Sequence, residues 1–294
     1  VLRVYDENDL RSVGTGSGGW SLSSNYVLIK DITLTGGGWT PVGSSSAPFT
    51  GSFDGNCHSI TGITINSVNG NQGMFGCIGS GTVKNLILLD VNIKGAGDTG
   101  SIAGKLTGSG ARIKNCYVTG AVEGVGTDKR RFGGIVGGMY NGTIVEACRS
   151  DTNVTNVGGY IGGIAGHSEG LIKDCMATGD VTTGSTALAM CAGGIAGLNC
   201  GGAGKIQNCY ATGLIRAERH VGGILGINQS TASPSAISGC IVLNALLEPA
   251  ANYYADSGRV YNYNTGTNGA DNYAWDGMVV TYRPIVPSST GNDG

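Results

Sequence analysis

The feature that most constrains this chain is an internal repeat built on glycine. The sequence Gly-Gly-Ile-x-Gly occurs four times, and two weaker copies precede it. The last glycines of the six copies are Gly76, Gly104, Gly137, Gly166, Gly197 and Gly226. The steps between them are 28, 33, 29, 31 and 29 residues, which gives a period of about 30. A unit this short cannot bury its own apolar face, so the copies are expected to stack.

A second signature, Ile-x-x-Cys, follows each glycine signature and marks one aligned position in every copy. The residues at that position are Ile63, Leu86, Cys116, Cys148, Cys175, Cys209 and Cys240. Stacking would place the five cysteines in one inward column, where a free cysteine acts as a small buried apolar residue. We expect mostly free thiols. A bridge between Cys191 and Cys200, which lie off the column, is the minor alternative.

Residues that tolerate a left-handed backbone stand four positions after the aligned residue and predict a corner there. They are Asp90, Gly120, Gly179, Gly213 and Asn244. β-branched residues follow the corners, so each copy offers three short strands. The period excludes a β-propeller, whose blades need about 40 residues, and the leucine-rich pattern is absent.

The repeat therefore predicts an all-β fold, a single-stranded right-handed parallel β-helix of about seven turns of roughly 30 residues. We expect one domain over residues 1–294. It divides into an N-terminal cap over 1–50, a repeat region over 51–245 and a C-terminal cap over 246–294. The first cap has a helical pattern at residues 7–13 and strand patterns at 26–29 and 32–34.

The net charge and the hydropathy of the chain limit the classes of partner that it is expected to bind. The net charge is −2 with no strong asymmetry along the chain, which argues against a nucleic-acid partner, since such proteins usually carry a basic face. No apolar run of 18 residues exists, so no membrane span is predicted. We expect a monomer, and the start at Val1 suggests a mature or trimmed chain.

Familiar catalytic and metal-binding motifs are missing from the sequence. There is no H-E-x-x-H, G-x-S-x-G, P-loop or C-x-x-C pattern. His58, His167 and His220 are therefore interpreted as surface or corner residues. Glu146 and Asp174 lie near the second strand of adjacent turns, two residues and one residue before the cysteine, so their side chains should face different directions. We interpret them as solvated charges at the rim. The sequence predicts no catalytic residues, no metal and no cofactor.

Aromatic residues gather near the C-terminus and are the candidate ligand-binding residues. They are Tyr253, Tyr254, Tyr261, Tyr263, Tyr273 and Trp275. Exposed aromatics stack on sugar rings or anchor a protein partner. The alternative is that they close the end of the helix core, and the same two interpretations apply to Trp20 and Trp39.

The pattern Gly-Gly-Ile-Ala-Gly followed by Ile-Lys-Asn-Cys-Tyr-x-Thr-Gly resembles the GLUG repeat of bacterial surface proteins. The lead-in Trp39-Thr40-Pro41-Val42-Gly43 and the tail around Asn272–Met278 are similar too, so the resemblance covers nearly the whole chain. It is strongest to secreted proteins of Bacteroides-like bacteria that carry the provisional name immunoglobulin A1 protease. The resemblance implies an extracellular or cell-surface location. The catalytic zinc motif of those proteases has no counterpart here.

Three functions remain open at this point. The first is a non-catalytic surface or secreted module for adhesion or for binding a host glycan or protein. The second is a carbohydrate-active β-helix enzyme, a lyase or hydrolase, which would need carboxylates along one sheet. The third is an accessory region of a protease resembling the immunoglobulin A1 proteases.

Overall fold

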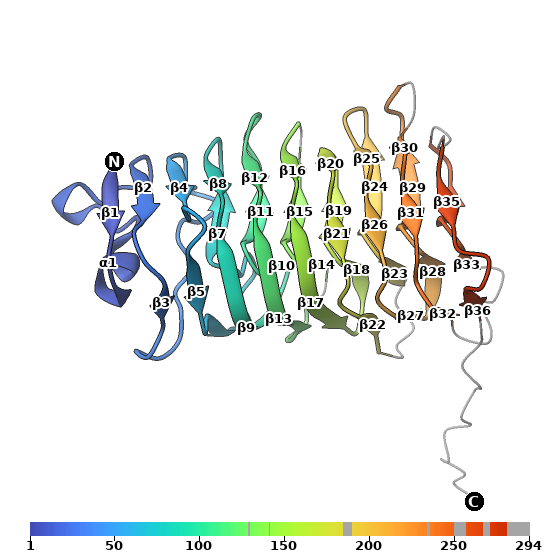
Figure 1. The fold of residues 1–294 in the computed structure, drawn as a ribbon, viewed down its shortest axis with the longest axis horizontal. Helices are drawn as coiled ribbons and strands as arrows, with labels where there is room; N and C mark the ends of the chain where they lie inside the picture. Colours follow the sequence, from blue (N-terminus) through green and yellow to red (C-terminus); the bar gives the residue numbers. More distant parts are fainter. Residues whose placement is uncertain are drawn as a thin grey trace, which may run out of the picture.

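The computed structural model describes residues 1–128, 130–140, 142–184, 190–233, 236–249, 257–266 and 271–280. Over these residues the chain is a parallel β-solenoid of about eight turns, drawn as a rod in Figure 1. The fold class predicted from the repeat is therefore confirmed. The division into two caps and a repeat region stays a prediction.

Four parallel sheets, named A to D, run along the rod. Sheet A has nine described strands, one from nearly every turn. They are β1 (Leu2–Val4), β2 (Asn25–Leu28), β4 (Ser52–Asp54), β8 (Thr82–Lys84), β12 (Arg112–Lys114), β16 (Ile144–Glu146), β20 (Leu171–Lys173), β25 (Lys205–Gln207) and β30 (Ile237–Ser238). Strands β1 and β2 pair in parallel and continue into β4, so the first residues of the chain extend the same sheet.

Sheet B is the largest sheet in the described part of the chain, with 14 strands. It contains β3 (Ile32–Thr33), β5 (Ser59–Thr61), β6 (Thr64–Asn66), β9 (Ile87–Gly95), β13 (Tyr117–Gly124), β17 (Arg149–Asn156), β21 (Met176–Ala177), β22 (Val181–Thr183), β26 (Tyr210–Ala211), β27 (Ile215–Ala217), β31 (Ile241–Val242), β32 (Leu246–Pro249), β35 (Tyr273–Ala274) and β36 (Val279–Val280). Some turns cross it with one long strand and others with two short ones.

Sheets C and D complete the cross-section. Sheet C contains β7 (Phe75–Ile78), β11 (Ala103–Leu106), β15 (Val136–Met139), β19 (Ala165–Ser168), β24 (Ala196–Gly201), β29 (Leu225–Ser230) and β34 (Tyr261–Asn264). Sheet D contains β10 (Asp98–Gly100), β14 (Arg131–Gly133), β18 (Gly159–Gly162), β23 (Met190–Gly193), β28 (Arg219–Gly222) and β33 (Ser257–Gly258). One complete turn thus runs from sheet A through B and D to C, as in β12, β13, β14 and β15. The repeat has this fourth strand in sheet D, which the prediction of three strands per copy missed.

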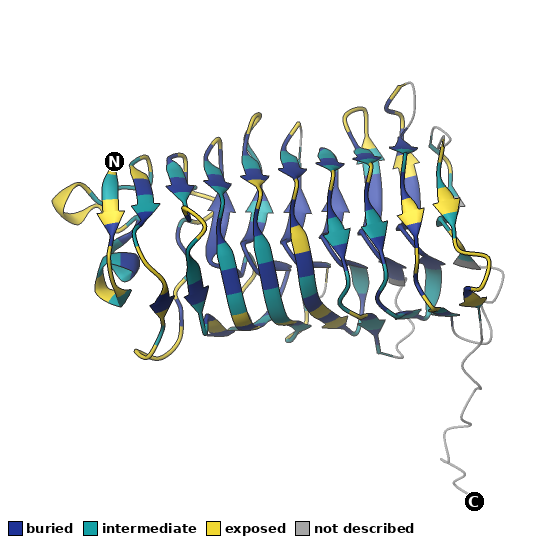
Figure 2. Cartoon of the chain, viewed as in Figure 1, coloured by how far each residue is buried: buried dark blue, intermediate teal, exposed yellow. Residues whose placement is uncertain are grey.

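The cysteine column forms as predicted. Cys116, Cys148, Cys175, Cys209 and Cys240 are all buried, and none of them is disulfide-bonded. The alternative bridge between Cys191 and Cys200 is not formed. The thiol of Cys148 points to the carbonyl oxygen of Ile113 in the preceding turn, at 3.8 Å. Burial raises the pKa of the Cys148, Cys175 and Cys209 thiols well above the ordinary value. The column is therefore part of the buried core of the rod. Figure 2 shows buried positions in every turn from the first to the last.

The last glycine of each signature lets sheets C and D approach closely. A Cβ on Gly166 would lie 2.4 Å from the backbone nitrogen of Phe132 in β14, and one on Gly137 would lie 2.2 Å from that of Thr99 in β10. Any side chain larger than hydrogen would push the two strands apart. Glycine therefore recurs at this position because the sheet C strand of each turn packs closely against the sheet D strand of the preceding turn.

The predicted left-handed corner is confirmed in two copies, at Asp90 with φ of 53° and at Gly120 with φ of 126°. A second left-handed corner, which was not predicted, falls one residue before the aligned position, at Asn85, Asn115, Ala147, Asp174 and Asn208, with φ between 51° and 54°. Gly179 and Gly213, expected to be left-handed, are not among the positive-φ residues. They are small for another reason, since a Cβ on Gly179 would lie 2.1 Å from the carbonyl oxygen of Thr152.

The N-terminal end carries helix α1 (Glu7–Ser12) and the 3-10 turn η1 (Ser17–Gly19). The side chain of Asp6 accepts hydrogen bonds from the backbone nitrogens of Asn8 and Asp9 and so begins α1. Trp39 is buried and donates its indole N–H to the carbonyl of Met74, at 2.9 Å, which favours the core interpretation for this tryptophan. No helix among the described residues is long and apolar enough to cross a membrane.

Candidate functional site

The structure separates the aromatic residues that the sequence grouped as ligand-binding candidates. Tyr261 and Tyr263 lie on β34 in sheet C, and the Tyr261 ring is half-buried against the main core. Tyr273 lies on β35 in sheet B and Trp275 just after it, and both side chains are exposed, at 67% and 47%. Tyr253 and Tyr254 lie outside the described residues. Tyr273 and Trp275 are therefore the two candidates on one described surface.

That surface is the outer face of sheet B. Successive strands place one residue of each turn in register along it, and we name this set the outer row. Its members are Ile87, Tyr117, Arg149, Met176, Tyr210, Ile241 and Tyr273. The residues that follow them, such as Leu88, Val118 and Val242, are fully buried. Because side chains alternate along a strand, the outer row faces away from the core.

The C-terminal part of the outer row is apolar and exposed. Ile241 on β31 pairs with Tyr273 on β35. Leu243 and Trp275 directly follow these two strands, and the Trp275 backbone nitrogen donates to the Val242 carbonyl at 2.9 Å. These four residues, named here the apolar patch, are each more than 40% exposed. Figure 2 shows the exposed positions on β31 and β35 side by side. An exposed group of this kind typically marks a binding surface.

Tyr117 and Arg149, near the N-terminal end of the outer row, belong to a polar cluster that hydrogen bonds hold in place. The Arg149 guanidinium lies 5.2 Å from the centre of the Tyr117 ring and binds both Asp151 carboxylate oxygens, at 2.6 and 2.7 Å. The Tyr117 hydroxyl donates to Asp151 at 2.9 Å. Burial raises the pKa of Asp151, but hydrogen bonds from Arg149, Thr178 and Tyr117 outweigh it and the pKa lies below its usual value. This cluster therefore presents an aromatic ring beside an ion pair whose charges compensate each other.

A shallow hollow of about 250 Å³ adjoins this end of the outer row. It is lined by Cys57, Asn85, Ile87, Asn115, Cys116, Tyr117, Ala147 and Arg149. The left-handed corner places the two asparagine amides here, and Asn115 donates to Asn85 at 2.8 Å. Apolar and aromatic walls with a few fixed polar groups are the usual composition of a ligand site.

The two acidic residues named from the sequence have different surroundings. Glu146 is buried, contrary to the expectation of a solvated charge, because Arg112, Lys114 and Lys173 surround it at 3.1 to 3.4 Å. Those bonds outweigh the effect of burial and hold the pKa of Glu146 below its usual value. Asp174 is exposed, as expected, and accepts a hydrogen bond from Asn208 at the corner.

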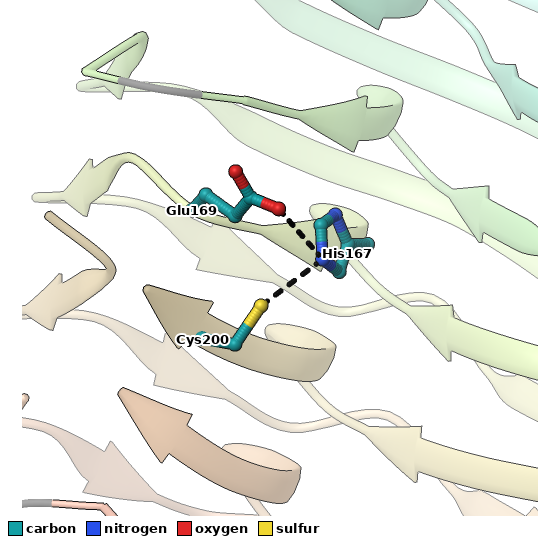
Figure 3. A group of neighbouring side chains, drawn as sticks. All are labelled: His167, Glu169 and Cys200. Carbon is teal, nitrogen blue, oxygen red and sulfur yellow. Dashed lines mark hydrogen bonds and ion pairs between the residues drawn. The ribbon is translucent and has the colours of Figure 1, made fainter. Parts of the chain in front are cut away.

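A second polar cluster, between sheets C and D, was missed at the sequence level. His167, expected at the surface or a corner, is 4% exposed, and its ring packs 5.3 Å from the ring of Tyr140. Its Nε2 lies 3.2 Å from the Cys200 thiol and 3.6 Å from a Glu169 oxygen (Figure 3). The expectation was wrong because the partner Cys200 stands 33 residues away, on the next turn. Only knowledge of the register between turns would have joined the two.

The charges of this cluster do not match those of a cysteine nucleophile. Burial, and next the positive charge of Arg131, lowers the pKa of His167 to about 4. Burial, and next the charge of Glu169, raises the pKa of Cys200 to about 11. The pair is therefore a neutral imidazole beside a neutral thiol, whereas a nucleophilic cysteine needs a depressed pKa.

Comparison with known proteins agrees with the repeat. The GLUG motif family matches residues 157–182, the segment from β18 to β22. An immunoglobulin A1 protease of Streptococcus pneumoniae is 31% identical over 163 residues, which is 52% of this chain and 8% of that protein. Halomucin of Haloquadratum walsbyi is 32% identical over 124 residues, which is 38% of this chain and 1% of that protein. The chain thus spans less than a tenth of the length of either relative.

A solved structure supports the fold. The crystal structure of a Bacteroides ovatus protein provisionally named immunoglobulin A1 protease superposes with a TM-score of 0.63. The superposition covers 93% of this chain and 83% of that one, at 23% identity. Taken with the motif and the sequence relatives, this chain is a parallel β-solenoid that carries the GLUG motif and is similar to a small part of the immunoglobulin A1 proteases.

Proposed function

We propose that this chain is a non-catalytic repeat module of a secreted or cell-surface protein, and that it binds an extended glycan or protein ligand along the outer face of sheet B. The single observation that carries the proposal is the outer row, which leads into the apolar patch of Ile241, Leu243, Tyr273 and Trp275. The surface location is supported by similarity to halomucin and to immunoglobulin A1 proteases.

A glycan is the ligand that the outer row suits best. Tyr117 and Tyr273 offer ring faces on which sugars stack, and the asparagine amides beside Tyr117 offer hydrogen-bond donors and acceptors. A protein ligand would instead use the apolar patch as a central anchor, since aromatic residues dominate such contacts.

The test is a binding and turnover screen on mucin, a panel of host glycans and immunoglobulin A, with product detection alongside. We expect binding without turnover, and at least a tenfold weaker affinity for Tyr273→Ala and Trp275→Ala, since truncating a central anchor costs about 2 kcal/mol or more. Tyr5→Ala is the matched control, because Tyr5 is 43% exposed at the opposite end of the rod.

Three results would count against the proposal. Equal losses for Tyr5→Ala and Tyr273→Ala would show that the surface is not specific. Depolymerisation of a polysaccharide by the chain would show that it is a carbohydrate-active enzyme and not a non-catalytic module. Cleavage of immunoglobulin A by the isolated chain would place protease chemistry in it.

A second candidate, an accessory region of a larger protease, is favoured by the identity of 31% to an immunoglobulin A1 protease. The two candidates differ in the size of the native polypeptide. An immunoblot of the source cells with antibodies to this chain measures that size. A band far above 29.7 kDa, together with cleavage of immunoglobulin A by the purified full-length protein, supports the accessory role.

A further inference from the structure

Three side chains of different chemistry converge between sheets C and D. His167 lies on β19, Glu169 directly follows that strand, and Cys200 lies on β24 of the next turn. One ligand atom of each lies within 4.8 Å of the other two (Figure 3). The outer row of sheet B does not include them, so they are independent of the proposed ligand surface.

The imidazole nitrogen stands at the centre of this group. Nε2 of His167 contacts both the Cys200 sulfur at 3.2 Å and the Glu169 oxygen at 3.6 Å. Around a tetrahedral zinc ion, bond lengths of about 2.0 to 2.3 Å separate such ligand atoms by roughly 3.4 to 3.6 Å. The two separations from Nε2 are close to these, and the Cys200 sulfur lies within 4.8 Å of the Glu169 oxygen. Small shifts of the Cys200 and Glu169 side chains would therefore admit the ion.

The imidazole is already oriented for such a role. Its ring packs against Tyr140, whose hydroxyl donates to Asp98 at 3.0 Å, and Arg131 in turn binds Asp98 at 3.1 Å. His167 is buried, while Glu169 keeps 28% of its side chain exposed. A buried, fixed ligand beside a partly exposed one gives a site that is rigid and still open to ions from solvent.

We propose that His167, Glu169 and Cys200 form a zinc-binding site. Nitrogen, thiolate and carboxylate ligands together suit Zn²⁺, whereas Mg²⁺ and Ca²⁺ prefer oxygen alone. The thiol loses its proton to solvent on binding, and the resulting thiolate and the carboxylate balance the two charges of the ion. Three protein ligands leave the fourth position for water. The site differs from the sequence expectation of no metal because its ligands come from two turns of the solenoid.

The experiment uses the full chain after treatment with a chelator. Titration with Zn²⁺ against a chromophoric competitor is expected to give one ion per chain. Co²⁺ in its place is expected to produce visible bands and an ultraviolet sulfur-to-cobalt charge-transfer band. Cys200→Ser is expected to abolish the charge-transfer band, and His167→Gln to weaken Zn²⁺ binding at least a hundredfold.

Two further variants keep the result interpretable. Glu169→Gln alters a partly exposed side chain, so it folds even if a variant at buried His167 does not, and it is expected to weaken binding at least tenfold. Cys77→Ser, at a buried thiol beside Thr107 and outside the group, is expected to bind as the unaltered chain does. Absence of binding by the unaltered chain, or binding that survives in Cys200→Ser and Glu169→Gln alike, would overturn the proposal.

Discussion

At the scale of single residues, the corner before the cysteine column shows what a sequence pattern leaves undetermined. Asparagine and aspartate occupy it in four turns, and these residues adopt a left-handed backbone at low cost. Ala147 stands there in the fifth with φ of 51° and no polar group to compensate. The backbone at Ala147 is therefore strained, and the stacking of the neighbouring turns keeps it in the left-handed conformation.

The strain at Ala147 predicts an unusual stabilisation. Replacement by glycine relieves the left-handed strain, so Ala147→Gly is expected to raise the free energy of unfolding by about 0.5 to 1 kcal/mol. Ala121, an exposed residue of strand β13 without positive φ, is the control, and Ala121→Gly is expected to lower it by a similar amount. Denaturant titrations measure both. A loss of stability in both variants would refute the strain at Ala147.

The buried carboxylate of Glu146 predicts a dependence on pH. Its pKa is lowered in the folded chain, so its stabilisation is complete above the unfolded value of 4.5 and is lost as the pH falls through the folded value. Glu146→Gln leaves Arg112, Lys114 and Lys173 without a counter-charge and is expected to cost about 1 to 3 kcal/mol at pH 7. Because the amide does not titrate, the difference between the two proteins should shrink below pH 4.5. A constant difference across that range would contradict the assigned role.

At the scale of the elements, the fold between sheets D and C depends on glycine. Gly166→Ala would bring a methyl group to within 2.4 Å of the Phe132 backbone nitrogen, and neither strand can move without breaking its ladder. We expect a loss of about 1 to 3 kcal/mol or more, as for overpacked cores. Gly202→Ala is the control, because the nearest atom there lies 4.0 Å away. The midpoints of thermal unfolding of the two variants measure this difference. Equal midpoints would show that the close packing at Gly166 does not limit the size of the side chain there.

Some elements of the fold could be predicted from the sequence and others could not. The glycine period and the cysteine position predict the solenoid and its column of buried cysteines, because both are set by stacking and burial. The strand in sheet D was missed because short segments such as Arg131–Gly133 have no apolar alternation of their own. The pair of His167 and Cys200 was missed because its proximity depends on the register between turns.

At the scale of the whole molecule, the solenoid presents its outer row as a linear surface. The row crosses seven strands, and a spacing of about 4.8 Å between strands gives it a length of roughly 30 Å. If an extended glycan is the ligand, affinity is expected to rise with chain length until the oligosaccharide spans this distance and then to level off. Calorimetry with a series of defined lengths measures this, and affinity independent of length would indicate one local site instead.

The column of buried thiols has a consequence for the lifetime of the folded chain. Thiol oxidation and disulfide exchange proceed through the thiolate, which burial suppresses in Cys148, Cys175 and Cys209. Unfolding releases nine cysteines at once, and in an oxidising medium they would cross-link in non-native pairs. In such a medium the folded chain is lost at the rate at which it unfolds, so its lifetime there is governed by an activation barrier and not by an equilibrium.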